Sequence, residues 1–139
     1  MPYYRGMTRG LCAVLGSFGY GQGEIAALIR FTPVEASAQE LRRWLLTEVL
    51  PGASRMSGLG SAHLLQQAEA APMTHEQSIR GADRGIDSAL IVVGYDGKAV
   101  AGCARELCAA GGLPSRGATA ITSATYGFHY SLTRAEIDA

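Results

Sequence analysis

Two stretches of the sequence are apolar on both sides of an extended chain, and this feature constrains the fold most. Residues 24–32 (EIAALIRFT) and residues 88–95 (SALIVVGY) are short, rich in β-branched and aromatic residues, and bounded by turn-forming residues. Such runs are typical of β-strands in a sheet whose two faces are both buried. We therefore expect a sheet that is covered on both sides.

A helix is predicted after the first of these strands. Residues 37–50 place apolar side chains on one helical stripe. Ser37 and Glu40 have the spacing of a capping box, in which the hydroxyl caps the helix and the carboxylate reaches back. Arg42 and Arg43 fall off the stripe and are predicted to point into solvent. The Pro-Gly pair that follows is predicted to end the helix.

Four further segments complete the pattern. Residues 98–110 repeat apolar residues at i, i+3, i+4, i+7 and i+8, which predicts a second helix. Residues 55–67 and 118–132 are predicted strands. Residues 68–87 show no clear period, and a loop of this length inside a compact domain is uncommon and often functional.

We expect one domain, residues 24–133, preceded by an extension of residues 1–23 and followed by a polar tail of residues 134–139. The extension is rich in Gly, Tyr and Ser and is expected to be irregular, with the apolar run 11–15 as a candidate short strand. The order of elements in the domain is β-α-β-β-α-β. This is the split βαβ or ferredoxin-like arrangement of the α+β class.

Two helices cover only one face of a four-stranded sheet. Because the strands at 24–32 and 88–95 are apolar on both sides, the second face would expose a contiguous apolar patch. We therefore expect two copies of the chain to pair their sheets around a twofold axis, as a homodimer. The low charged fraction, 17% of residues, agrees with a surface that is partly covered.

The charge balance bears on partners. Lys and Arg number 12, and so do Asp and Glu, so the chain lacks the basic excess of a nucleic-acid binder. No stretch approaches the roughly 18–20 apolar residues of a membrane-spanning helix, and the first residues make no convincing signal peptide. We expect neither nucleic acid nor a membrane among the partners.

The three cysteines, Cys12, Cys103 and Cys108, form no CxxC pair. Their odd number and their spacing argue against a disulfide scaffold and against a structural zinc site. A cytoplasmic location is the natural expectation. Basic residues are nearly all arginine, and alanine and glycine are abundant, which indicates a GC-rich bacterial source.

With this element order, the chain resembles the dimeric α+β barrel superfamily, which includes the antibiotic biosynthesis monooxygenase, EthD-like and stress-responsive barrel families. The resemblance covers roughly residues 24–132 and rests on the helix at 41–52 (LRRWLLTEVLPG), the strand at 57–65 (SGLGSAHLL) and the run at 126–130 (YGFHY). It implies a homodimer with a pocket between the sheet and the helices or inside the dimer barrel. Many members are cofactor-independent enzymes acting on aromatic or polyketide-like molecules, and others have no known catalysis.

Histidine and arginine supply the candidate chemistry. His63 lies in the middle of a predicted strand and His129 lies in the last one, and in this fold the two can approach one pocket. A neutral imidazole is a natural general base, and Arg30, at the end of the first strand, can hold a carboxylate or a phenolate. The competing interpretation is a hydrogen-bonded strand histidine without a role.

The long loop at 68–87 holds two more candidates, His75 and Arg80. They become substrate contacts if the loop folds over the pocket. A solvated loop is the favoured alternative. The acidic residues nearby match no standard metal-ligand spacing, so no metal site is expected.

Aromatic side chains are candidate pocket walls. Tyr126 and Tyr130 share one side of the last strand. Trp44 faces inward from the first helix, and Tyr95 ends the third strand. An aromatic pocket would suit a flat substrate, whereas plain core packing is the stronger interpretation.

These features lead to two hypotheses. The first is a small cofactor-independent enzyme of monooxygenase, isomerase, cyclase or lyase type, which acts on an aromatic or polyketide-like molecule by histidine acid/base catalysis. The second is a non-catalytic ligand-binding or stress-associated dimer with the same pocket. The sequence contains no GxSxG, Walker or HExxH motif and no haem or flavin signature, so we expect no cofactor.

Overall fold

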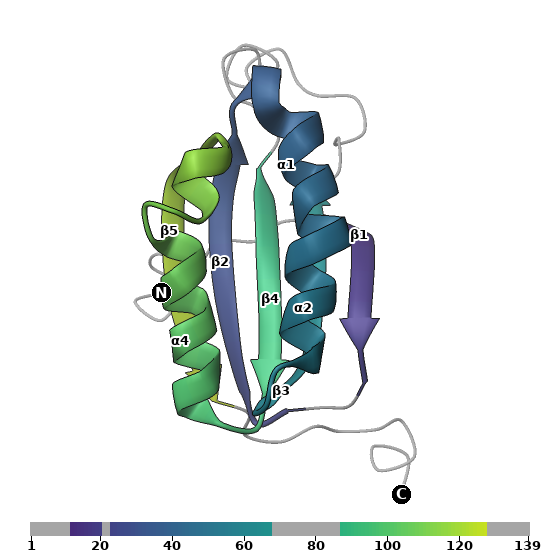
Figure 1. Ribbon diagram of the computed structural model, residues 1–139, viewed down its shortest axis with the longest axis vertical. Coiled ribbons are helices and arrows are strands. Elements are labelled where there is room, and N and C mark those ends of the chain that lie inside the picture. The colour runs from purple at the N-terminus through teal and green to yellow at the C-terminus, as the bar shows by residue number, and fades with distance from the viewer. Residues whose placement is uncertain (1–11, 21–22, 68–86, 128–139) are drawn as a thin grey trace, which may run out of the picture.

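The computed structural model describes residues 12–20, 23–67 and 87–127. These residues form an α+β fold with one antiparallel sheet and helices packed against it (Figure 1). The elements follow one another as β1 (Cys12–Gly19), β2 (Ile25–Pro33), η2 (Glu35–Ser37), α1 (Ala38–Trp44), η3 (Leu45–Val49), α2 (Leu50–Arg55), β3 (Leu59–Gln67), β4 (Ser88–Gly94), α4 (Gly97–Cys108), η4 (Leu113–Arg116) and β5 (Ala118–Gly127).

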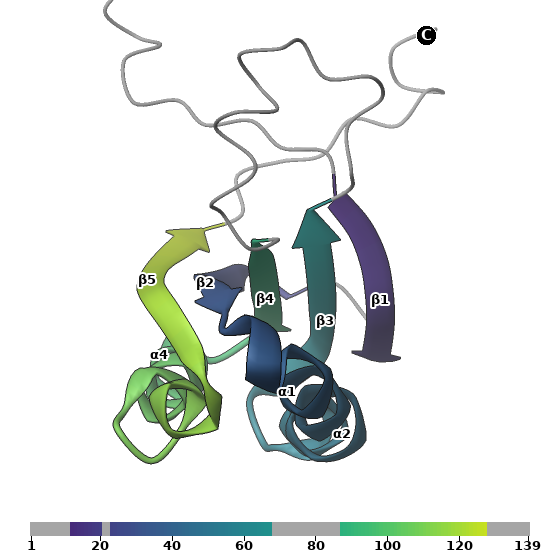
Figure 2. The ribbon, with the colours of Figure 1, turned by 90° about the horizontal axis from the view of Figure 1, so that it is seen from above.

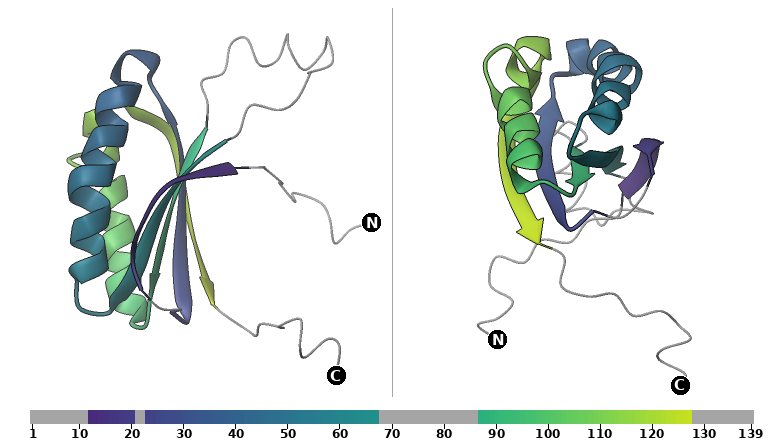
Figure 3. Two further views of the ribbon diagram at one scale, coloured as in Figure 1. Left: turned by 90° about the vertical axis from the view of Figure 1, so that its right-hand side faces the viewer. Right: turned by 60° about the horizontal axis from the view of Figure 1, so that its bottom comes forward.

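The five strands lie side by side in the order β1-β3-β4-β2-β5, and every neighbouring pair is antiparallel. Strand β2 therefore runs between β4 and β5, although the helical elements η2 to α2 and strand β3 separate it from β4 in the chain. Seen from above, the helices form one layer and the strands another (Figure 2). Both helical segments lie on the same side of the sheet, and among the described residues none lies over its other side (Figure 3).

The core lies between these two layers. Strand β2 directs Ala27, Ile29 and Phe31 into it, and all three are almost completely buried. The helices contribute Leu41, Leu45, Leu50 and Val100 from their inner faces. Alternation along β2 then places Ala26, Leu28 and Arg30 on the opposite side of the sheet. We call that side, which faces away from the helices, the open face.

The predicted order β-α-β-β-α-β is found over β2 to β5, with the strands at 25–33 and 88–94 and the second helix at 97–108 close to their predicted positions. All but the last residue of the predicted loop, and part of the last predicted strand, lie outside the described residues: residues 68–86 and 128–132. No helix among the described residues has the length and the apolar character to cross a membrane.

Residues 12–19, which fell within the expected extension, form β1 and pair with β3 at one edge of the sheet. The run 11–15 indicated only a short strand, because Gly16, Ser17 and Gly19 have weak strand propensity. Pairing with β3 supplies the backbone hydrogen bonds that propensity does not predict. A bulge between Val14 and Gly16 interrupts this pairing.

The first helix does not end at its Pro-Gly pair, contrary to the prediction. It passes through a π-helical segment, η3, and continues as α2 to Arg55. In η3 the Leu50 N–H donates to the carbonyl of Leu45, five residues back. This wider turn accommodates Pro51, which has no N–H to donate and whose ring would clash in a regular helix. The Ser37 side chain makes no capping hydrogen bond, because a 3₁₀ turn, η2, already precedes the helix.

Candidate functional site

The open face carries three of the residues predicted for the site, His63, Arg30 and Tyr126. The pairing register shows which side chains are neighbours across the strands. One row across this face, read from β1 to β5, contains Ser17, His63, Ile91, Leu28 and Ala124. The row on one side of it contains Gly19, Ser61, Val93, Ala26 and Tyr126. The row on its other side contains Val14, Leu65, Ala89, Arg30 and Thr122.

The centre of the open face is therefore apolar, and its polar groups lie on two sides. The half-buried Ile91 and Leu28 occupy the middle of the central row. His63, on β3, lies toward the β1 edge. Arg30, on β2, lies toward the β5 edge and is exposed. Two strand spacings, about 10 Å, separate the strands that carry His63 and Arg30.

His63 is held by hydrogen bonds at both ring nitrogens. Its Nδ1 lies 2.8 Å from Ser17 Oγ on β1, and its Nε2 lies 3.2 Å from Ser61 Oγ on the same strand. A neutral imidazole has one N–H and one lone pair, so one hydroxyl accepts from the ring and the other donates to it. These two contacts fix the orientation of the ring. A substrate reaches a ring nitrogen by displacing a hydroxyl or by exchanging a proton through it.

Ser61 lies two residues before His63 on β3, so alternation along the strand puts the two side chains on one face. The sequence does not indicate Ser17 as a partner. Ser17 lies 46 residues from His63 in the chain, inside the expected extension. Only the β1–β3 register, in which Ser17 lies directly opposite His63, reveals the contact.

The two described tyrosines of the predicted site are largely exposed. Tyr126 is 55% exposed on β5, in the row of Ser61. Tyr95 is 58% exposed just after β4. The Tyr95 ring lies close to Gly60 of β3, because a Cβ built on Gly60 would lie 3.5 Å from the Tyr95 hydroxyl oxygen. Neither tyrosine is part of the core, so the alternative of plain core packing does not apply to Tyr126.

Trp44 lies on the other side of the sheet, in the helical layer. It is half-buried against the core, and it lines a shallow hollow of about 330 Å³ between the two helical segments. The other residues that line this hollow are Val49, Gly52, Ala53, Met56, Cys103, Glu106, Leu107, Gly111 and Gly112. Because the sheet stands between them, the structure does not bring Trp44 together with His63 or Arg30.

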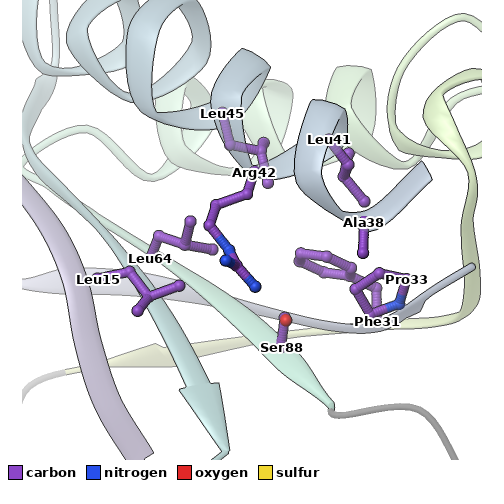
Figure 4. Close-up of a pocket in the computed structure, with 9 residues that line it drawn as sticks. All are labelled: Leu15, Phe31, Pro33, Ala38, Leu41, Arg42, Leu45, Leu64 and Ser88. Carbon is purple, nitrogen blue, oxygen red and sulfur yellow. The ribbon is translucent and has the colours of Figure 1, made fainter. Parts of the chain in front are cut away.

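A second, much smaller cavity lies between α1 and the sheet (Figure 4). Arg42 extends into it from the helix, and its Nη2 donates a 2.8 Å hydrogen bond to Oε1 of Gln66. Arg42 is exposed, as predicted, and Gln66 near the end of β3 offers its guanidinium a partner. With a volume of about 10 Å³, the cavity has room for about one water molecule and not for a substrate.

The remaining predicted site residues, His75, Arg80, His129 and Tyr130, lie outside the described residues. Within the described ranges, no three His, Cys, Asp or Glu side chains are grouped so that they could hold a metal ion. Burial raises the pKa of the Cys103 thiol, and the charge of Glu106 adds to the effect. Burial also raises the pKa of Cys108. Neither thiol has the lowered pKa of a nucleophilic cysteine.

No protein-family model matches this chain, and no curated protein sequence matches it at a significant level. The function is therefore inferred from the geometry of the open face.

Proposed function

We propose that this chain is a ferredoxin-like protein that pairs the open face of its sheet with that of a second copy, as a dimeric α+β barrel. A small aromatic or polyketide-like molecule binds between the two sheets. His63 acts on it as acid or base, and Arg30 holds an anionic oxygen. The strand order β3-β4-β2-β5, with helices on one side only, supports the ferredoxin-like part of this proposal.

The apolar character of the open face supports the dimer. Leu28, Ile91 and Val93 are branched apolar residues at neighbouring positions of adjacent strands, with alanines around them. Strands that are apolar on both sides belong to sheets that are covered on both sides. Burial of several hundred Å² per chain contributes on the order of 10 kcal/mol before the costs of association. A second copy offers the same apolar surface and needs no further partner.

One observation carries the enzymatic part: an imidazole fixed at both nitrogens stands beside an apolar surface. An aromatic ring can lie on Ile91 and Leu28, with one end at His63 and the other at Arg30. The Ser17 hydroxyl is exposed and can be displaced by a substrate hydroxyl, whereas the buried Ser61 continues to orient the ring. General acid or base catalysis requires such a group within hydrogen-bond reach of the proton that moves.

A non-catalytic ligand-binding or stress-associated dimer remains the alternative. The two partners of His63 are neutral hydroxyls, and a hydroxyl strengthens an imidazole base less than a carboxylate does. A histidine in this setting also suffices to donate a hydrogen bond to a bound ligand. Binding without turnover is the result that favours this second function.

The two functions are separated by a panel of aromatic carboxylates, phenols and polyketide-like compounds, tested for thermal stabilisation and for turnover with the full chain. We expect Arg30→Gln to weaken binding of the anionic compounds. We expect His63→Gln or His129→Gln to reduce turnover at least tenfold while binding persists. Arg43→Gln, on the exposed side of α1, is the matched control. If neither histidine variant changes the turnover of a compound that the protein converts, the catalytic assignment is wrong.

A further inference from the structure

We propose that Ser17 is a reactive serine, a nucleophile activated by His63 toward acyl and phosphonyl donors. This activity goes beyond the acid/base function proposed above. It requires neither the dimer nor Arg30, since Ser17 and His63 belong to one chain and lie on adjacent strands.

The activation requires the tautomer of His63 in which Ser17 donates to Nδ1, 2.8 Å away, and the ring donates from Nε2 to Ser61, 3.2 Å away. A neutral imidazole with a hydroxyl at each nitrogen permits this arrangement. In this tautomer the Nδ1 lone pair points at the Ser17 proton. A base at hydrogen-bond distance from a hydroxyl and oriented by a third group is the arrangement that activates serine nucleophiles.

The two serines differ in access. Ser61 is 5% exposed, so no electrophile of useful size reaches its oxygen. Ser17 is exposed on the edge strand β1. In the next row across these strands, Val14 lies opposite Leu65, and the Val14 side chain is 62% exposed. This apolar pair gives an acyl or alkyl chain a surface to lie on beside the Ser17 hydroxyl.

The acyl-transfer step balances with the groups present. Ser17 Oγ bonds to the carbonyl carbon of an activated ester while its proton passes to His63 Nδ1. The bond from that carbon to the leaving oxygen then breaks, and the leaving alkoxide takes the proton from the imidazolium. Water later hydrolyses the acyl-serine by the same proton route. With a phosphonofluoridate the new bond is to phosphorus, fluoride leaves, and the serine proton is released through His63 to solvent.

The neutral Ser61 sets a limit to the rate. In a Ser-His-Asp triad, the carboxylate stabilises the imidazolium that forms during the reaction, and a hydroxyl does so only weakly. We therefore expect one label per chain and slow release rather than rapid turnover. An alkyl fluorophosphonate is the appropriate probe, because it modifies activated serines and its product is stable.

The test is to incubate the full folded chain with an alkyl fluorophosphonate and to locate the adduct by peptide mass spectrometry. We expect one adduct, on Ser17. Ser17→Ala abolishes it, and His63→Gln slows it about tenfold or more. Ser115→Ala is the matched control, since among the described residues the partners of the Ser115 hydroxyl are the backbone carbonyls of Gly111 and Gly112.

Circular dichroism establishes that each variant is folded. The exposed position of Ser17 makes unfolding by Ser17→Ala unexpected. The proposal is overturned if the folded protein takes no label, if the label lies on another residue, or if labelling of Ser17 proceeds at the same rate in folded His63→Gln.

Discussion

The guanidinium carbon of Arg116 lies 4.6 Å from the centroid of the Trp44 ring. This contact joins η4, the 3₁₀ turn before β5, to the end of α1, so it connects two segments that are far apart in the chain. Trp44 is half-buried: it packs against the core, and the Arg116 guanidinium lies over its ring. The indole is thus part of the helical layer and not of the open face.

The first prediction concerns this pair. A cation over an indole at an exposed site contributes about 0.5–1 kcal/mol. We expect Arg116→Ala to lower the free energy of unfolding by about this amount, measured by urea denaturation. Arg116→Met is the matched control, because it keeps a long apolar side chain without the charge. If Arg116→Met is as stable as the native chain, the charge contributes nothing and the cation–π description is wrong.

The second prediction concerns the oligomeric state. We expect a light-scattering mass of twice the chain for the native protein and a mass near one chain for Leu28→Asp, since a carboxylate at the centre of an apolar interface is costly to bury. Leu28 is half-buried in one chain, so unfolding must be distinguished from dissociation. Ala124→Asp does this, because Ala124 lies in the same row and is exposed in one chain.

The matched control for this experiment is Gln39→Asp, which adds the same charge on the exposed side of α1. We expect it to leave the mass unchanged. A native mass near that of one chain, or an unaltered dimer in both open-face variants, would contradict pairing through the open face.

Much of the fold could be predicted because its strongest signals are local. The apolar run around Ile29 and the period that places Val100 and Cys103 on one helical stripe specify β2 and α4 without any long-range information. Strand β1 could not be delimited in this way, since Gly16 and Ser17 are stabilised there by pairing with β3. Likewise, Pro51 is a reliable helix-stop signal only where no π-helical turn makes room for it.

The candidate site, like the fold, could be predicted only where it depends on local sequence patterns. Alternation along each strand shows from the sequence which neighbours share a strand face with His63 and with Arg30. The sheet topology then brings these two strand faces together on the open face. The Ser17 contact and the exclusion of Trp44 both depend on which strands and layers are neighbours. Such relationships are set by tertiary packing, and no local pattern records them.

The third prediction tests the continuation of the first helix. If the helix ended at Leu50, Gly52 would occupy a C-terminal position that favours glycine, and alanine there would destabilise. In the structure Gly52 lies inside α2, and a Cβ built on it meets no atom within 4 Å. Gly52→Ala should therefore raise the free energy of unfolding by about 0.5–1 kcal/mol, as glycine replacement inside a helix does.

Gly58→Ala is the opposite control for this prediction. Gly58 has a φ of +86°, and a Cβ there would approach Ala99 Cβ to 2.8 Å, so alanine should destabilise. Chemical denaturation of both variants measures the change in the free energy of unfolding, which we expect to be an increase for Gly52→Ala and a decrease for Gly58→Ala. A loss of stability in Gly52→Ala would show that the helix ends before it.

The last prediction concerns Cys103 and pH. Burial, aided by Glu106, raises the pKa of this thiol above its ordinary value of 9.0. In alkaline solution the unfolded chain therefore releases the thiol proton at a lower pH than the folded chain does. Between the two pKa values the folded state binds more protons, so the free energy of unfolding falls as pH rises. The stabilisation is complete below pH 9.0 and is lost as pH passes through the folded pKa.

Urea denaturation on either side of pH 9.0 measures this loss. We expect Cys103→Ala to show a smaller decline in stability with pH than the native chain, whatever its stability at neutral pH. Cys12→Ala is the control, because Cys12 is exposed and its removal should leave the decline unchanged. Equal declines in the native chain and in Cys103→Ala would mean that the Cys103 thiol ionises alike in the folded and unfolded states. Its burial in the core would then have no electrostatic consequence.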